Sequence, residues 1–395
     1  MPYKFEKPES NKPTMGIYIH IPFCVKKCDY CDFFSVANAT PRDKKLFHNA
    51  LIDQLAQCRS DADDRVIDTV YIGGGTPSCY GADLLADLLI KLRERYDVSP
   101  DCEITVECNP DTTTERLLTR LKAVGVNRLS MGVQSACNGE LKQVGRIHDF
   151  ATAQGAFRLG RKVGFDNLSL DLIYGLPGQT MVSWQQSVEA ILELEPDHLS
   201  CYGLKVEEGT PLYEHQYALT MADDDTQADM YLWMVERLER AGYGQYEISN
   251  FARPGKHSRH NMRYWLGQEY IGLGPSAHHY LNGCRGAIVR SLEDYSTGVL
   301  GCGQFWEPER RIDRAERIRE YVLLQMRTTW GIGREEYESR YGLKFDPLET
   351  QLEAFRDYGW TVCEDTRWHF TPKGFLVSNA LIGQLLDAQE PYLPE

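Results

Sequence analysis

The sequence of 395 residues has no apolar run of membrane-spanning length, which argues against a transmembrane helix. Positive charge is scarce, because 43 Lys and Arg residues face 57 Asp and Glu residues and the net charge is −14. Broad binding to nucleic acid through phosphates is therefore disfavoured. The first 14 residues, MPYKFEKPESNKPT, lack the apolar core of a secretory signal, so we expect a flexible tail at 1–14. Twelve cysteines without such a signal predict a cytoplasmic protein.

The pattern of apolar residues predicts an α/β fold. A chain of this length, with 42% apolar residues, is long enough for two or three domains. Expected strands alternate with amphipathic helices, and such repeats form a parallel sheet with right-handed crossovers. Six units would make an open, partial version of the TIM barrel, with a doubly wound sheet as the alternative. The expected strands lie near 16–21, 66–72, 103–108, 127–133, 166–173 and 198–203, and the helices near 41–59, 82–96, 113–124, 149–163 and 180–194.

Three cysteines follow the first expected strand with the spacing C-x3-C-x2-C: Cys24, Cys28 and Cys31. Thiolates this close on one loop suit a soft metal centre. A single zinc ion would need a fourth ligand, and none lies nearby in the sequence. An iron–sulfur cube is usually held by four cysteines, so three would leave one iron open to a ligand. The alternative is a loop with three buried cysteines.

Unusual residues gather where the expected strands end. In a parallel barrel, the active-site residues lie at the carboxyl ends of the strands. Several strands that direct polar groups to one rim therefore indicate a site, although a glycine run can equally form a tight turn. These residues are Gly73, Gly74, Gly75 and Thr76 after the second strand, Glu107 on the third, Gln134 at the end of the fourth, and Asp171 on the fifth.

Two later segments differ in character. His260, Asn261, Tyr264 and Trp265 stand in one short run, a candidate ligand-binding segment with one imidazole and two flat aromatic rings. A structural turn with Trp265 in the core is the alternative. The residues after about 310 predict three helices, then a hairpin and then a last helix. This order is typical of a winged-helix module. Its basic residues interleave with acidic ones, which favours a solvated helix face over a DNA surface.

The cysteine loop resembles the signature of the radical S-adenosylmethionine (SAM) superfamily. The longer string from Tyr18 to Cys24, YIHIPFC, narrows the resemblance to the group of oxygen-independent coproporphyrinogen oxidases and heme chaperones. The resemblance implies a partial (βα)6 barrel, a [4Fe-4S] cluster on the three cysteines, and SAM on the open iron. It also implies SAM contacts from Tyr18, Gly74, Gly75, Thr76, Glu107, Gln134, Arg146 and Asp171. Lys142 remains an alternative cation to Arg146.

Two features distinguish between the oxidases and the chaperones of that group. Phe33 stands where the oxidases carry a fourth cysteine, and the run from His260 to Trp265 matches the HNxxYW stretch of the heme chaperones. The resemblance therefore implies a chaperone that binds heme and delivers it to acceptor apoproteins. A coproporphyrinogen oxidase or another radical SAM enzyme is the alternative, so whether the chain is an enzyme stays open. Three other histidines rival His260 as the axial ligand: His257, His278 and His279.

The expected domains follow these motifs. After the tail, we expect a radical SAM partial barrel at 15–204, a barrel extension with the heme-binding segment at 205–305, and a mostly helical, winged-helix-like domain at 306–395. A homodimer and a peripheral membrane contact through one surface patch stay open.

Overall fold

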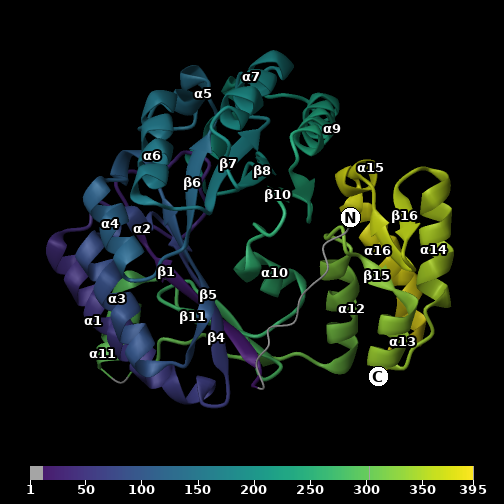
Figure 1. The fold of residues 1–395 in the computed structure, drawn as a ribbon. Helices are drawn as coiled ribbons and strands as arrows, with labels where there is room; N and C mark the ends of the chain where they lie inside the picture. Colours follow the sequence, from purple (N-terminus) through teal and green to yellow (C-terminus); the bar gives the residue numbers. More distant parts are fainter. Residues whose placement is uncertain (1–11, 302, 395) are drawn as a thin grey trace. The chain divides into compact units, whose positions relative to one another are not determined.

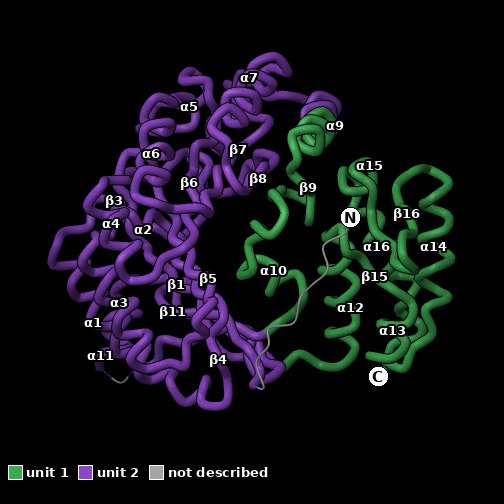
Figure 2. The backbone as a smooth tube through the Cα atoms, viewed as in Figure 1, with its two compact units in different colours: residues 1–7, 231–268, 311–395 green, residues 8–230, 269–310 purple. Residues whose placement is uncertain are grey.

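A computed structural model describes residues 12–301 and 303–394. Its contacts divide the chain into two compact units, each formed from separate stretches of sequence (Figure 2). Unit 2 contains the described residues of 8–230 and 269–310, and unit 1 contains 231–268 together with 311–394. In the part of the chain that the structure describes, no helix is long and apolar enough to cross a membrane.

Unit 2 is built on a parallel sheet whose strands follow one another in sequence order. The order β1-β4-β5-β6-β7-β8 confirms the barrel type of winding, because a doubly wound sheet would reverse direction part-way. Beyond β1, the sheet continues through β11, which is parallel to β1, and through the antiparallel β12 and β13. The strands are β1 (Thr14–Ile21), β4 (Val66–Gly74), β5 (Val98–Cys108), β6 (Arg128–Gln134), β7 (Leu168–Tyr174), β8 (His198–Gly203), β11 (Tyr270–Leu273), β12 (His278–Leu281) and β13 (Cys284–Ala287).

Helices connect these strands and cover the outer face of the sheet (Figure 1). N-cap residues fix where several of these helices begin. Thr40 and Thr180 form capping boxes, and the Asp149 side chain accepts a hydrogen bond from the backbone of Thr152. The helices are α1 (Pro41–Gln57), α2 (Pro77–Tyr80), α3 (Ala82–Arg95), α4 (Glu115–Ala123), α5 (Asn138–Gln143), α6 (Phe150–Val163), α7 (Met181–Leu192), α8 (Pro211–His215) and α11 (Leu292–Leu300).

The two faces of this sheet differ sharply in polarity. Successive residues of a strand point to opposite faces. Along β1, Ile17, Ile19 and Ile21 are fully buried, as expected for the face that carries the helices, whereas Tyr18 and His20 share the inner face. The same alternation along the other strands leaves a polar inner face, with Tyr71 and Glu107, Arg128 and Ser130, and Asp171.

Unit 1 contains the predicted C-terminal module. Three helices are followed by a hairpin and further helices, which confirms the order predicted from the sequence, and β15 adds a strand that the sequence did not predict. Residues of the 231–268 segment pack with it, since Gln325 Nε2 donates to the Trp265 carbonyl at 2.9 Å. The elements are α10 (Arg259–Trp265), α12 (Arg314–Gln325), β15 (Ile332–Gly333), α13 (Arg334–Tyr341), α14 (Asp346–Asp357), β16 (Thr361–Glu364), β17 (Arg367–Phe370), α15 (Pro372–Leu376) and α16 (Ser378–Gln389).

The compact units differ from the expected domain boundaries. The segment predicted as one barrel extension, 205–305, contributes 231–268 to unit 1 and its remaining residues to unit 2. The domain boundaries at 205 and 306 stay a prediction. Most of the predicted tail, residues 1–11, lies outside the described residues, and Thr14 already belongs to β1.

Candidate radical SAM site

The three cysteines lie on the loop that follows β1. Cys24 ends the short strand β2 (Phe23–Cys24), and its Sγ lies 3.4 Å from Thr76 Oγ1. Arg146 Nη1 donates to Cys28 Sγ at 3.4 Å. Burial, together with the nearby thiols of Cys28 and Cys24, raises the pKa of Cys31 to about 11. The three sulfur atoms are thus close enough to interact, and each is partly accessible.

This donor set suits a cluster better than one ion. Among the residues that the structure describes, no three His, Cys, Asp or Glu side chains are arranged to hold a single metal ion. An iron–sulfur cube binds each cysteine through a different iron, so its thiolates stand farther apart than those around one zinc ion. Three soft sulfur ligands with an arginine beside them therefore fit a [4Fe-4S] cluster.

The glycine turn after β4 is tied to the cysteine loop. Gly75 N donates to the Ile21 carbonyl at 2.9 Å, and Thr76 N donates to the Phe23 carbonyl at 2.7 Å. A Cβ atom on Gly75 would lie 2.8 Å from the Phe23 carbonyl oxygen. Gly74 has a φ of +109°, and a Cβ there would lie 2.6 Å from the His20 ring. Packing therefore requires both glycines, whether or not a ligand also approaches them.

Two half-buried carboxyl groups face the inner side of the sheet. Glu107 accepts hydrogen bonds from the Tyr71 hydroxyl at 2.7 Å and from Gly74 N at 3.1 Å. Burial raises the pKa of Glu107 to about 7. Asp171 accepts a hydrogen bond from Ser130 Oγ at 3.2 Å, and burial raises its pKa as well. A ligand with hydroxyl groups could exchange hydrogen bonds with this pair.

Tyr18 adds an aromatic wall next to these carboxyl groups. Its ring stacks on that of Tyr71 with 6.3 Å between centroids, and its hydroxyl lies 3.1 Å from His20 Nδ1. Burial raises the pKa of the Tyr18 hydroxyl, and the charge of Glu107 raises it further. The inner end of β1 is therefore neutral and aromatic.

A third group of side chains converges on β6. Arg146 Nη2 donates to the carbonyl of Gly132, and a Cβ atom on Gly132 would lie 2.7 Å from both Arg146 Nη2 and Gln134 Nε2. Gln134 has a φ of +71°, which is unusual for a residue with a side chain. The alternative cation, Lys142, is exposed on α5. Arg146 is therefore the cation that lies beside the cysteines.

All eight residues expected around SAM belong to unit 2. Hydrogen-bond contacts connect Glu107 to Gly74, Thr76 to Cys24, and Arg146 to Cys28. Sequence reasoning missed His20 and Arg128, which also face inward. The alternation of strand residues could have revealed both, because His20 stands two residues after Tyr18, and Arg128 stands two before Ser130.

The HNxxYW segment forms most of α10, in unit 1. His260 is fully buried, and its Nε2 lies 2.9 Å from the Tyr264 hydroxyl. Trp265 packs against a small core of Tyr246, Ala252 and Met262. The tryptophan is half-buried on this core, and the imidazole has a partner within its own helix.

The rival histidines occupy different settings. His257 stacks edge-on against Tyr246, with 4.7 Å between the ring centroids. His279 is buried beside Glu309, with 3.1 Å between Nε2 and Oε1. His278 is exposed at the start of β12.

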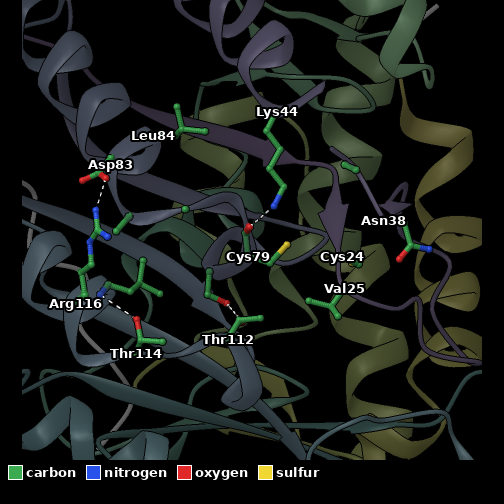
Figure 3. Close-up of a pocket in the computed structure, with 15 residues that line it drawn as sticks. Cys24, Val25, Asn38, Lys44, Cys79, Asp83, Leu84, Thr112, Thr114 and Arg116 are labelled. Carbon is green, nitrogen blue, oxygen red and sulfur yellow. Dashed lines mark hydrogen bonds and ion pairs between the residues drawn. The ribbon is translucent and has the colours of Figure 1, made fainter. Parts of the chain in front are cut away.

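A separate cavity of about 690 Å³ opens beside Cys24 (Figure 3). Its charged side chains are already engaged: Lys44 Nζ donates to the Cys79 carbonyl at 2.6 Å, and Arg116 pairs with Asp83 at 2.6 Å. Figure 3 shows these interactions along the wall. None of the eight residues expected around SAM lines this cavity.

Comparisons with known proteins agree with this geometry. The family model of the radical SAM superfamily matches residues 18–191, and the model of the HemN C-terminal domain matches residues 312–377. "Heme chaperone HemW" of Bacillus subtilis is 34% identical, over 93% of this chain and 98% of its own length. The protein of the same name from Escherichia coli is 35% identical, over 94% and 97%. The solved structure of Escherichia coli coproporphyrinogen III oxidase, HemN, has the same fold, with a TM-score of 0.83 at 24% identity, and the match covers 95% of this chain and 90% of that one.

Proposed function

The chain belongs to the HemW family of the radical SAM superfamily, and we propose that it is a heme chaperone, which binds heme and delivers it to acceptor proteins. The observation that carries the proposal is the similarity of 34–35% identity along nearly the whole chain to heme chaperones. The similarity to the oxidase structure, at 24% identity, concerns the fold alone.

The proposed cofactors are a [4Fe-4S] cluster and SAM. Cys24, Cys28 and Cys31 would hold the cluster, whose fourth iron would take the amino and carboxylate groups of SAM. Glu107 and Asp171 would accept hydrogen bonds from ribose hydroxyls, as carboxylates do in other nucleoside sites. The remaining contacts would come from Tyr18, Gly74, Gly75, Thr76, Gln134 and Arg146.

The rival function, oxidation of coproporphyrinogen, is not favoured. The oxidases carry a cysteine at the position of Phe33, whose side chain is here 67% exposed and cannot bind iron. The chain instead carries the HNxxYW stretch of the chaperones. We propose that this stretch contributes to heme binding, with His260 as the candidate axial ligand and Asn261, Tyr264 and Trp265 beside it.

A heme titration with two opposite variants tests this ligand assignment. Iron must take the Nε2 or Nδ1 atom of His260, and Nε2 now lies next to the Tyr264 hydroxyl. His260→Ala should abolish binding or shift the Soret band. Tyr264→Phe removes the competing hydrogen bond, worth about 0.5–1.5 kcal/mol, and should tighten ligation through Nε2 by about two- to tenfold.

The matched control is His278→Ala, which removes an exposed imidazole. If this variant alone loses the wild-type spectrum, the axial ligand lies on β12 and the assignment to His260 is wrong. If the wild-type protein, purified anaerobically with added heme, shows no heme spectrum at all, the chaperone function itself is refuted.

Heme and heme-accepting apoproteins are the proposed partners, and nucleic acid is not. We further propose a cytoplasmic location, with a homodimer and a peripheral membrane contact as the two assemblies to test. Light scattering of the heme-loaded protein and flotation with anionic vesicles would distinguish them.

A further inference from the structure

The inner face of the sheet in unit 2 contains a buried arginine outside the proposed set of SAM contacts. Arg128 begins β6 and is 1% exposed. Its Nε and Nη1 atoms have no hydrogen-bond partner among the described residues. A guanidinium group keeps its charge at every accessible pH, and a buried charge requires compensation. The question is which groups provide that compensation.

Strand register places Glu107 near this cation. Thr105 of β5 is the partner of Arg128, and Glu107 is the partner of Ser130, two residues farther along the same face. With strands about 4.8 Å apart and about 3.3 Å between residues, the backbones of Arg128 and Glu107 are roughly 8 Å apart. The long arginine side chain can shorten the distance between the two charges.

Asp171 lies on the other side of the same strand. Ser130 Oγ donates to Asp171 Oδ1 at 3.2 Å, and Gly132 is the register partner of Asp171. Burial raises the pKa of both Glu107 and Asp171. Hydrogen bonds from Tyr71 to Glu107 and from Ser200 to Asp171 counteract this effect, and the charge of Arg128 lowers the pKa of both groups further. One fixed cation thus acts on both carboxyl groups of the proposed ligand site.

We propose that Arg128 is a positioning residue, whose charge holds Glu107 and Asp171 as carboxylates that accept hydrogen bonds from the hydroxyl groups of a ligand. The identity of that ligand rests on the proposed SAM site, whereas the electrostatic role does not. A protonated carboxyl would present a donor in place of an acceptor, so the cation determines which hydrogen bonds the inner face can make.

The other titratable and charged groups around this pair do not change charge near neutrality. Burial raises the pKa of the phenols of Tyr18 and Tyr71 above their usual value and that of the Cys108 thiol to about 12. Burial also raises the pKa of Cys201, as does the nearby charge of Asp171, and burial lowers the pKa of His20 to about 4. Arg146 is a second fixed cation near Asp171.

Infrared titration of the full-length, cluster-loaded protein measures the proposed effect directly. The carbonyl band of protonated buried carboxyl groups reports their titration, and Glu107→Gln assigns the band. Arg128→Met should move the midpoint upward by about one to two pH units, as expected for the loss of one charge within roughly 8 Å in a medium of intermediate polarity. Arg128→Lys, which keeps the charge, should restore most of the wild-type midpoint.

The matched control is Arg240→Met, which removes an exposed arginine of the helix α9 (Asp224–Arg240) and should leave the midpoint unchanged. In titrations at pH 7.5, the Arg128→Met variant should bind SAM about tenfold more weakly than the wild-type protein does. At pH 9, its affinity for SAM should return to the wild-type value. Arg128→Gln provides a second neutral variant if Arg128→Met does not fold, as judged by circular dichroism.

An unchanged midpoint in a folded neutral variant would overturn the inference, as would a shifted midpoint with wild-type SAM affinity at pH 7.5. If wild-type protein binds no SAM, the proposed SAM site fails, but the infrared midpoints still decide whether Arg128 holds the two carboxylates.

Discussion

Gly74 provides a test of how closely the turn after β4 packs on the inner face. A side chain at this position meets two separate penalties. The φ of +109° strains any residue with a Cβ atom, at a cost of about 1–3 kcal/mol. The Cβ would also lie 2.6 Å from the His20 ring, and overpacking of this kind adds about 1–3 kcal/mol. We therefore expect Gly74→Ala to destabilise unit 2 by about 2–6 kcal/mol.

Gly81 is a matched control for the first penalty alone. Its φ is +121°, but a Cβ atom there would have nothing within 4 Å. Gly81→Ala should therefore cost only the backbone strain. Thermal unfolding of the cluster-free protein, followed by circular dichroism, should show a larger fall in the first melting temperature for Gly74→Ala than for Gly81→Ala.

A double-mutant cycle isolates the collision with the ring. His20→Ala removes the atoms that the new Cβ would meet, so it should recover about 1–3 kcal/mol of the Gly74→Ala penalty. The cycle of His20→Ala with Gly81→Ala should show no coupling. Equal losses for the two glycine variants, or no coupling between Gly74→Ala and His20→Ala, would refute the packing argument.

Three further predictions concern the cofactors and the reaction. A variant with Cys24, Cys28 and Cys31 changed to Ala should retain almost no iron or sulfide after anaerobic reconstitution, and normal contents of both would contradict the cluster assignment. Asp171→Ala should weaken SAM binding about tenfold or more, since a lost hydrogen bond to a charged group costs about 1.5–3 kcal/mol, and equal affinity by calorimetry would remove Asp171 from the site. The protein should form no protoporphyrinogen from coproporphyrinogen III with SAM and a reductant, because Phe33 replaces the oxidases' cysteine; robust product formation would show that it is an oxidase.

The barrel could be predicted because its signals are local. Each of the six parallel strands β1, β4, β5, β6, β7 and β8 begins within five residues of its expected position, since buried parallel strands form short apolar runs bounded by turns. The C-terminal hairpin of β16 and β17 was predicted for a similar reason, as alternation continues across a short turn. The sequence-order winding then follows from general rules of strand connection.

The parts that the sequence did not reveal depend on contacts distant along the chain. β11 pairs with β1 across about 250 residues, and no local pattern signals such a pairing. Arg128 has no motif of its own, and only the register with β5 and β7 shows that it shares a face with Glu107 and Asp171. The hydrogen bond between His260 and Tyr264 could have been expected from their i, i+4 spacing had the helix been predicted.

The discontinuous make-up of unit 1 has a consequence for biosynthesis. The segment 231–268 is packed by partners that are translated much later: Thr328 forms a bridge with Glu247, Thr329 N donates to the Tyr246 carbonyl, and Gln325 bonds to Trp265. While the ribosome is still producing 269–310, which belongs to unit 2, the helix with His260 lacks these partners. The nascent chain must therefore leave one unit unfinished while it completes the other, and the proposed heme segment acquires its native packing only when the last quarter of the chain has emerged.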